Sequence, residues 1–95
     1  MFEVRLTSVF SAWLDGLKDA RAAERIAQRL LRVQSGLLGD AKFFEGIGEL
    51  RIDYGPGYQL YFVRRGKALI ILLCGGDKST QARDISRAKK MAQEV

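Results

Sequence analysis

The side chains best able to do chemistry in this sequence are cationic, because its 95 residues include no histidine. A His general base, a Ser–His or Cys–His nucleophile pair and a His-built metal site are therefore excluded. Arg51, Gln59 and Tyr61 occupy alternate positions of two segments with period-2 patterning, which places them on one face of a sheet. Basic and aromatic side chains on one sheet face predict a groove for a phosphate backbone.

The last predicted helix supplies a second group of cations beside that face. It is expected to begin near residues 77–80. One side of it is apolar, with Ile85, Ala88, Met91 and Ala92. Another side is basic, with Arg83, Arg87, Lys89 and Lys90. Sixteen Lys and Arg residues against eleven Asp and Glu residues give a net charge of +5, an excess that favours an anionic partner without naming it.

Composition and cysteine content narrow the class of protein further. Apolar residues make up 47% of the chain and charged residues 28%, which is typical of one globular domain over residues 1–95. The single cysteine, Cys74, lacks a partner for a disulfide or a zinc site and is interpreted as a small core side chain. We expect no metal and no cofactor. Without a long apolar run or a signal-peptide pattern, the sequence predicts a cytoplasmic protein that does not enter a membrane.

The elements that must position these side chains follow from hydrophobic periodicity. A first strand is expected at residues 2–6, where apolar and polar residues alternate. Apolar spacings of three and four then predict a helical hairpin over residues 8–35, with Asp19 opening its second helix. The outward face of that helix is interpreted as a solvated face or, alternatively, as a surface for a partner. It carries Arg21, Arg25, Arg29 and Arg32.

From Gly46 the period changes to two and predicts a meander of three strands with turns around Pro56 and Gly66. The order β-α-α-β-β-β-α implies a single α+β domain. Its helical hairpin packs on one face of a small, mostly antiparallel sheet. The other face is then expected to be open. It carries Glu49, Arg51, Asp53, Gln59 and Tyr61.

Three segments make the sequence resemble a known family. They are Gly39-Asp40-Ala41-Lys42, the run 49–58 with its Tyr-Gly-Pro-Gly-Tyr turn, and the run 72–81 with its Cys-Gly-Gly-Asp-Lys-Ser sequence. Together they resemble the HigB-like branch of the RelE/ParE toxin superfamily, whose members are often called addiction-module killer proteins. The resemblance covers nearly the whole chain and implies a RelE-like fold.

The resemblance implies the toxin of a bacterial type II toxin–antitoxin system, acting as an mRNA-cleaving endoribonuclease. RelE- and HigB-type toxins cleave mRNA, typically in the ribosomal A site and without a metal, so mRNA and the ribosome are expected partners. The other expected partner is a cognate antitoxin, usually a helix-turn-helix DNA-binding protein, through which alone the toxin reaches operator DNA. Two alternatives stay open: inhibition of DNA gyrase, as in ParE-like members, and antitoxin binding without catalysis.

The resemblance also assigns roles to cationic side chains. Cleavage of RNA by its own 2′-OH needs a base near that hydroxyl, cations for the phosphorane-like charge and a proton for the leaving 5′-oxygen. Arg51 and Lys78 match basic positions of the family and are expected to be catalytic. Lys42 is expected to reach the RNA groove from the loop before the second strand.

Two positions depart from the family pattern. Gln59 stands where members usually carry the Arg that contacts the scissile phosphate, which implies a weakened or non-toxic form, natural or engineered. Asp84 stands near the place of a Tyr credited with acid–base work in RelE-type members, and it is expected to be structural. Tyr61 is the candidate for stacking on bases, and Arg83 and Arg87 are further candidates for RNA binding.

Overall fold

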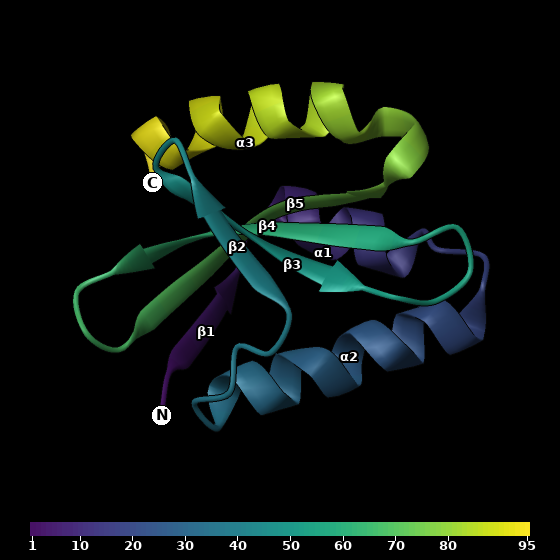
Figure 1. Cartoon of the computed structure of the whole chain (residues 1–95), viewed down its shortest axis with the longest axis horizontal. Coiled ribbons are helices and arrows are strands. Elements are labelled where there is room, and N and C mark those ends of the chain that lie inside the picture. The colour runs from purple at the N-terminus through teal and green to yellow at the C-terminus, as the bar shows by residue number, and fades with distance from the viewer.

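The computed structural model describes residues 1–95 as three α-helices and one five-stranded mixed sheet (Figure 1). The strands are β1 (Glu3–Leu6), β2 (Ala41–Phe44), β3 (Ile47–Ile52), β4 (Tyr58–Arg65) and β5 (Leu69–Asp77). The helices are α1 (Ser8–Asp15), α2 (Ala20–Gln34) and α3 (Gln81–Glu94), and a 3-10 turn, η1 (Lys78–Thr80), precedes α3. The chain is an α+β domain, as the sequence predicts. No helix is long and apolar enough to cross a bilayer.

The sheet order is β1-β5-β4-β3-β2, so β5 lies between the first strand and the rest of the meander. Strands β2 to β5 pair antiparallel, which confirms the predicted meander. Strand β1 pairs parallel with β5, and Glu3 lies opposite Leu69. The first strand therefore joins the sheet as expected and makes it mixed.

Strand β2 corrects the prediction that residues 41–44 form a loop. It is an edge strand of four residues in which Lys42 lies opposite Glu49. Glu45 (φ 51°) and Gly46 (φ 86°) turn the chain into β3, and two consecutive left-handed residues are typical of a tight hairpin turn. So short a strand, with Phe43 and Phe44 side by side, shows no clear period of two.

The helical hairpin α1–α2 covers one face of the sheet, as predicted. Asp19 caps α2, and its carboxylate accepts hydrogen bonds from the backbone N–H groups of Arg21 (3.0 Å) and Ala22 (3.2 Å). Trp13 packs against the core that forms between hairpin and sheet. The buried members of this core are Phe10, Ala22, Ile26, Val33, Leu50, Ile52, Tyr58, Leu60, Phe62, Ile70 and Leu72.

The opposite face of the sheet is not open, and this is the main correction to the predicted fold. Helix α3 lies across that face and builds a second core with it (Figure 1). The buried members of this core are Ile47, Tyr61, Val63, Leu73, Cys74 and Ala88. The alternation placed Glu49, Gln59 and Tyr61 on a shared face correctly. The apolar stripe of α3 must also be buried, however, and α1 and α2 already occupy the other face.

Asp84 fixes the first turn of α3 on the sheet. It is 4% exposed, and its carboxylate accepts a hydrogen bond from the Thr80 hydroxyl at 2.6 Å. Gly76 of β5 permits this close approach, since a Cβ there would lie 1.9 Å from Asp84 Oδ2. The burial agrees with the structural role expected of Asp84.

We expect Gly76→Ala to lower the free energy of unfolding by about 2 kcal/mol, because overpacking a well-packed site typically costs about 1–3 kcal/mol. Urea denaturation followed by circular dichroism measures the change. In a double-mutant cycle, Gly76→Ala with Asp84→Ala should cost less than the sum of the single changes, since the clash needs both side chains. Strict additivity would show that Asp84 does not rest on Gly76.

Cys74 is a core side chain, as interpreted from the sequence. It is 2% exposed, and its Sγ lies 3.6 Å from the Asp84 carbonyl oxygen. Burial, assisted by the charge of Asp84, raises the pKa of the Cys74 thiol to about 11. Stability that depends on the protonated thiol is therefore complete below the ordinary thiol pKa of 9.0 and is lost as the pH rises through about 11.

This shift predicts that the free energy of unfolding falls between about pH 9 and pH 11, and falls less steeply in Cys74→Ala. Urea titrations of both proteins across that range measure the two slopes, and their difference isolates the thiol from the tyrosines. The native thiol should also resist disulfide reagents at neutral pH and react once the chain unfolds. Equal slopes in both proteins, or rapid reaction of the native thiol, would contradict its burial.

Candidate nucleic-acid interface

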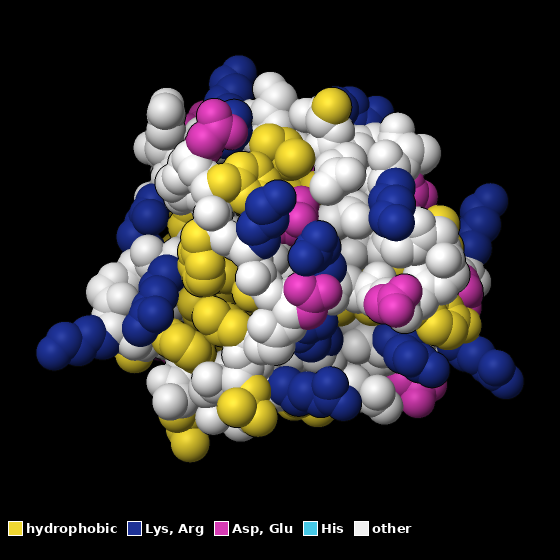
Figure 2. Space-filling view, viewed as in Figure 1, with side chains coloured by type: hydrophobic (Ala, Val, Ile, Leu, Met, Phe, Trp, Pro, Cys, Tyr) yellow, Lys and Arg dark blue, Asp and Glu magenta, His cyan; other side chains and the backbone are white.

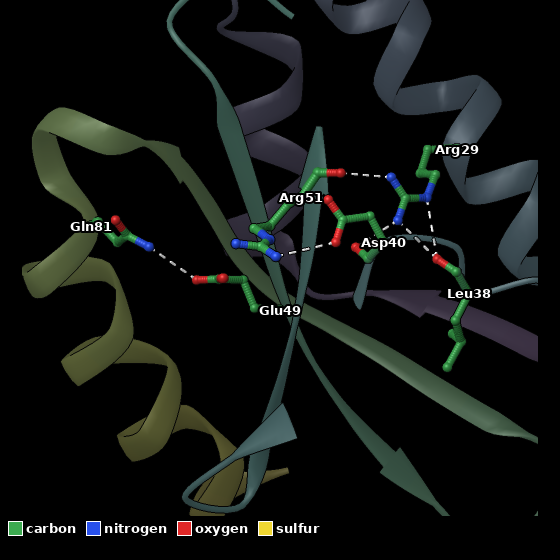
Figure 3. A network of polar contacts seen from close by, with 6 residues as sticks. All are labelled: Arg29, Leu38, Asp40, Glu49, Arg51 and Gln81. Atoms are coloured by element: carbon green, nitrogen blue, oxygen red, sulfur yellow. Dashed lines mark hydrogen bonds and ion pairs between the residues drawn. The ribbon is translucent and has the colours of Figure 1, made fainter. Parts of the chain in front are cut away.

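Arg51 lies on the side of β3 that faces α3, at the end of the sheet where β3 and β4 meet their turn. Its side chain is 52% exposed, and its Nη2 lies 3.3 Å from Asp40 Oδ1 (Figure 3). Exposed ion pairs are weak, and a guanidinium has five N–H donors, so Arg51 retains donors for a ligand. The structure leaves this predicted catalytic residue accessible.

Arg29 of α2 holds the backbone on both sides of this ion pair. Its guanidinium donates to the carbonyl oxygens of Leu38 (2.9 and 3.2 Å), Asp40 (2.8 Å) and Arg51 (2.7 Å), as Figure 3 shows. Burial lowers the pKa of Arg29, which nevertheless remains a cation at neutral pH. We call this arrangement the Arg29 clamp, because one side chain ties α2 to the loop before β2 and to β3.

Gly39 allows the Arg29 clamp to form. Its φ of +69° suits glycine, and a Cβ at this position would lie 3.0 Å from Arg29 Nη2. The next residue, Asp40, also accepts a hydrogen bond from the Arg51 backbone N–H at 3.0 Å. Sequence reasoning missed this role of Arg29, because helical periodicity does not reveal which later loop a side chain meets. The only feature of the sequence that pointed to a special backbone conformation in this loop was the Gly39-Asp40 pair.

Gln59 and Lys78 lie at the same end of the sheet as Arg51. Gln59 of β4 is paired with Arg51 on one side and with Gly76 on the other. Lys78 follows β5 in η1, and its side chain crosses the turn before β4, where a Cβ on Gly57 would lie 3.1 Å from Lys78 Cε. Two exposed cations therefore border a buried amide.

The expectation that Gln59 faces an open groove is wrong. The residue is 3% exposed beneath α3, and its Oε1 has no hydrogen-bond partner. A buried amide cannot contact a phosphate while α3 occupies this position. The alternation identified the correct face of β4, and α3 covers it.

The expectation that Tyr61 is open to stack on bases is also wrong. Its ring is fully buried in the second core, and its hydroxyl has no hydrogen-bond partner although Glu49 is its neighbour across the strands. Burial, followed by the charge of Glu49, raises the pKa of Tyr61 far above its ordinary value. Tyr61 is therefore a neutral core residue in this fold.

The remaining predicted RNA contacts are exposed but fall into two places. Lys42 extends from β2 on the same side as Arg51, with its ammonium 5.7 Å from the centre of the Phe44 ring. Arg83 and Arg87 instead line a hollow of about 500 Å³ between α1 and α3, over β5. The structure thus places Lys42 on the same sheet face as Arg51, with its ammonium directed toward Phe44, and places Arg83 and Arg87 apart from both.

We give the name cationic strip to three exposed cations: Lys42 of β2, Arg51 of β3 and Lys78, which follows β5. Two of them form no ion pair, and Arg51 pairs only with the exposed Asp40. Gln81 of α3 donates to Glu49 at 3.2 Å beside the strip (Figure 3). A planar guanidinium and an ammonium group together can bind a phosphate and stabilise the negative charge that develops on its oxygens. No group of three or more metal-ligating carboxylates or thiols is present.

A comparison with known proteins relates the whole chain to one relative. A protein of Haemophilus influenzae, described as an uncharacterized protein, is 49% identical over 94 residues, which cover 98% of this chain and 95% of the relative. The chain belongs to the same family as that protein. Because the match spans nearly all of both chains, the relation includes every element of the fold. No protein-family model matches the chain.

Proposed function

We propose that this chain is the toxin of a bacterial type II toxin–antitoxin system and cleaves mRNA at the ribosome without a metal ion. The observation that carries the proposal is the cationic strip. Two of its members, Arg51 and Lys78, are exposed and match basic positions of the HigB-like branch of the RelE/ParE superfamily, which the sequence resembles. The order of helices and strands supports a RelE-like fold, and the net charge of +5 suits an anionic substrate.

In this proposal the RNA supplies its own nucleophile. The 2′-hydroxyl gives its proton to a water molecule as its oxygen bonds to the adjacent phosphorus, and the bond from phosphorus to the 5′-oxygen breaks. The guanidinium of Arg51 and the ammonium of Lys78 stabilise the charge that develops on the phosphate oxygens. Since the chain has no histidine, Lys78 or a water molecule delivers the proton to the leaving 5′-oxygen.

Induction of the chain in a bacterial host without its antitoxin tests the proposal. Pulse labelling should show protein synthesis falling before DNA synthesis, and mapping of RNA 5′ ends should find new ends inside coding regions. Intact mRNA at a dose that arrests growth would contradict cleavage. Gyrase-trapped DNA breaks with an SOS response would identify a gyrase inhibitor instead.

The surroundings of Gln59 favour a second candidate function, antitoxin binding without catalysis. A buried neutral amide stands where the family usually has a phosphate-contacting Arg. This function predicts neither growth arrest nor mRNA cleavage on induction. It also predicts a stable complex with the product of a neighbouring helix-turn-helix reading frame, and stronger operator repression by that complex than by the helix-turn-helix protein alone.

A further inference from the structure

The outward face of α2 carries a row of long polar side chains at helix-packing intervals. We call it the arginine row: Arg21, Arg25, Gln28 and Arg32. Successive members are four, three and four residues apart, which aligns them along one side of the helix. They border a hollow of about 530 Å³. In Figure 2, Lys and Arg side chains are spread over the visible face, and those over the lower part of the molecule, where α2 lies, have a few carboxylates among them.

The four arginines of α2 have different roles in the structure. The Arg29 guanidinium donates its hydrogen bonds within the Arg29 clamp. Arg25 places its guanidinium over the Tyr54 ring, 4.9 Å from the ring centre. The side chains of Arg21 and Arg32 are exposed and form neither an ion pair nor a hydrogen bond. These two cations, together with the exposed edge of Arg25, are available to a partner.

The charges of Arg21 and Arg25 do not stabilise α2 itself, and only Arg32 lies in the last turn, where a cation suits the helix dipole. Arg21 and Arg25, and likewise Arg25 and Arg29, are one helical turn apart, and like charges at this spacing destabilise a helix. The only acidic residue of α2 is Glu24, and it forms no ion pair. Binding of negative charge from outside would relieve this repulsion.

We propose that the arginine row docks an acidic amphipathic helix of a protein partner. The intervals of four, three and four are those of a seam between two helices, and the row extends over about 16 Å, or roughly three turns of a partner. Leu31, 65% exposed, flanks the row about 100° around the helix from Arg32 and offers apolar contact at its edge. This surface lies on the hairpin side of the sheet, whereas the cationic strip lies on the α3 side.

The carboxylates of the hollow favour a protein over a nucleic acid. Glu24 and Asp53 line it together with the arginines. A continuous phosphate backbone would bring negative charge against both, whereas a peptide can place a Lys, an amide or a gap opposite them. The docking does not depend on RNA cleavage, so it holds for either function proposed above.

Binding of the full chain to two synthetic helical peptides of about 15 residues tests this proposal. The first peptide carries glutamates at intervals of four, three and four with leucines alongside. The second has the same composition, with the glutamates distributed around the helix. At physiological salt we expect the first to bind at least about tenfold more tightly, because only it can pair with the row in register. Amide NMR shifts should centre on residues 21–32.

Matched variants separate specific docking from general attraction. Arg21→Ala with Arg32→Ala should weaken the first peptide about tenfold, whereas Lys67→Ala with Lys90→Ala should weaken it less than about twofold, although it removes the same charge from other surfaces. Equal affinity of the two peptides, or equal weakening by the two double variants, would overturn the proposal. Tighter binding of a single-stranded RNA of equal charge at residues 21–32 would overturn it in favour of a nucleic-acid site.

Discussion

Arg51→Ala is expected to lower mRNA cleavage by about 10²- to 10³-fold, because removing one preorganised donor to developing charge typically costs that much. Its effect on folding should be small. The ion pair with Asp40 is exposed, and such pairs contribute about 0.2–1 kcal/mol. Quantified RNA 5′ ends after induction measure the first effect, and thermal unfolding of the purified variant measures the second.

Arg5 provides the matched control for this experiment. It also forms an exposed ion pair, with Glu3 at 2.6 Å, but it lies on β1 at the opposite edge of the sheet. Arg5→Ala should leave cleavage unchanged. Arg51→Ala combined with Lys78→Ala should lose little more than the stronger single variant, because groups that act on one transition state are non-additive. A folded Arg51→Ala protein with full cleavage would remove the cationic strip from the proposed mechanism.

Arg29→Ala is expected to cause the largest loss of stability, about 3 kcal/mol, because hydrogen bonds from a charged donor contribute about 1.5–3 kcal/mol each and water replaces only some of them. For a domain of this size we expect the melting temperature to fall by more than about 10 °C. Calorimetry or circular dichroism measures the fall. Cleavage should fall as well, since the backbone on both sides of Arg51 loses its support.

Arg32→Ala is the control on the same helix. It removes an equal charge from an exposed position that forms no hydrogen bond, so its effect should stay within about 0.5 kcal/mol. Arg29→Lys should recover only part of the loss, because an ammonium lacks the planar fork that reaches three carbonyl groups. If Arg29→Ala is as stable as Arg32→Ala, the Arg29 clamp does not operate in solution.

The parts of the fold that depend on periodicity were predictable from the sequence. The hairpin of α1 and α2, the meander and the core around Leu60 and Phe62 all follow from spacings of 3.6 and two residues. Periodicity states which side chains share a face, but not what covers that face. For this reason Gln59 and Tyr61 were expected in an open groove and are found beneath α3.

The exposed cations of the candidate site could be predicted from the sequence, but the hydrogen bonds that hold the backbone around them could not. Arg51 and Lys78 could be selected because a surface cation can be recognised from its residue type and from its place in the motifs that resemble the family. The Arg29 clamp joins residues nine to twenty-two positions apart through backbone carbonyls, which have no signature in side-chain identity. The same limit applies to Gly76. That this position must be glycine becomes clear only from the structure, where the Asp84 carboxylate occupies the space that a Cβ would need.

The place of β5 in the sheet has a consequence for how the chain folds during synthesis. Its partners are β1, made 66 positions earlier where Glu3 meets Leu69, and β4, made just before it. The Thr7 hydroxyl likewise donates to the Leu73 carbonyl oxygen at 2.7 Å. Contacts between such distant residues form slowly, because a long loop must close before they stabilise the chain.

A nascent chain that ends before residue 69 therefore has β1, the α1–α2 hairpin and strands β2 to β4, but it lacks β5, the strand that joins β1 to the others. The second core needs α3 in addition, so it can form only once residues 81–94 have been made. Two members of the cationic strip, Lys42 and Arg51, lie on strands of this sheet, and the third, Lys78, follows β5 directly. We expect the chain to acquire any activity of the strip in one cooperative event after synthesis, rather than gradually on the ribosome that makes it.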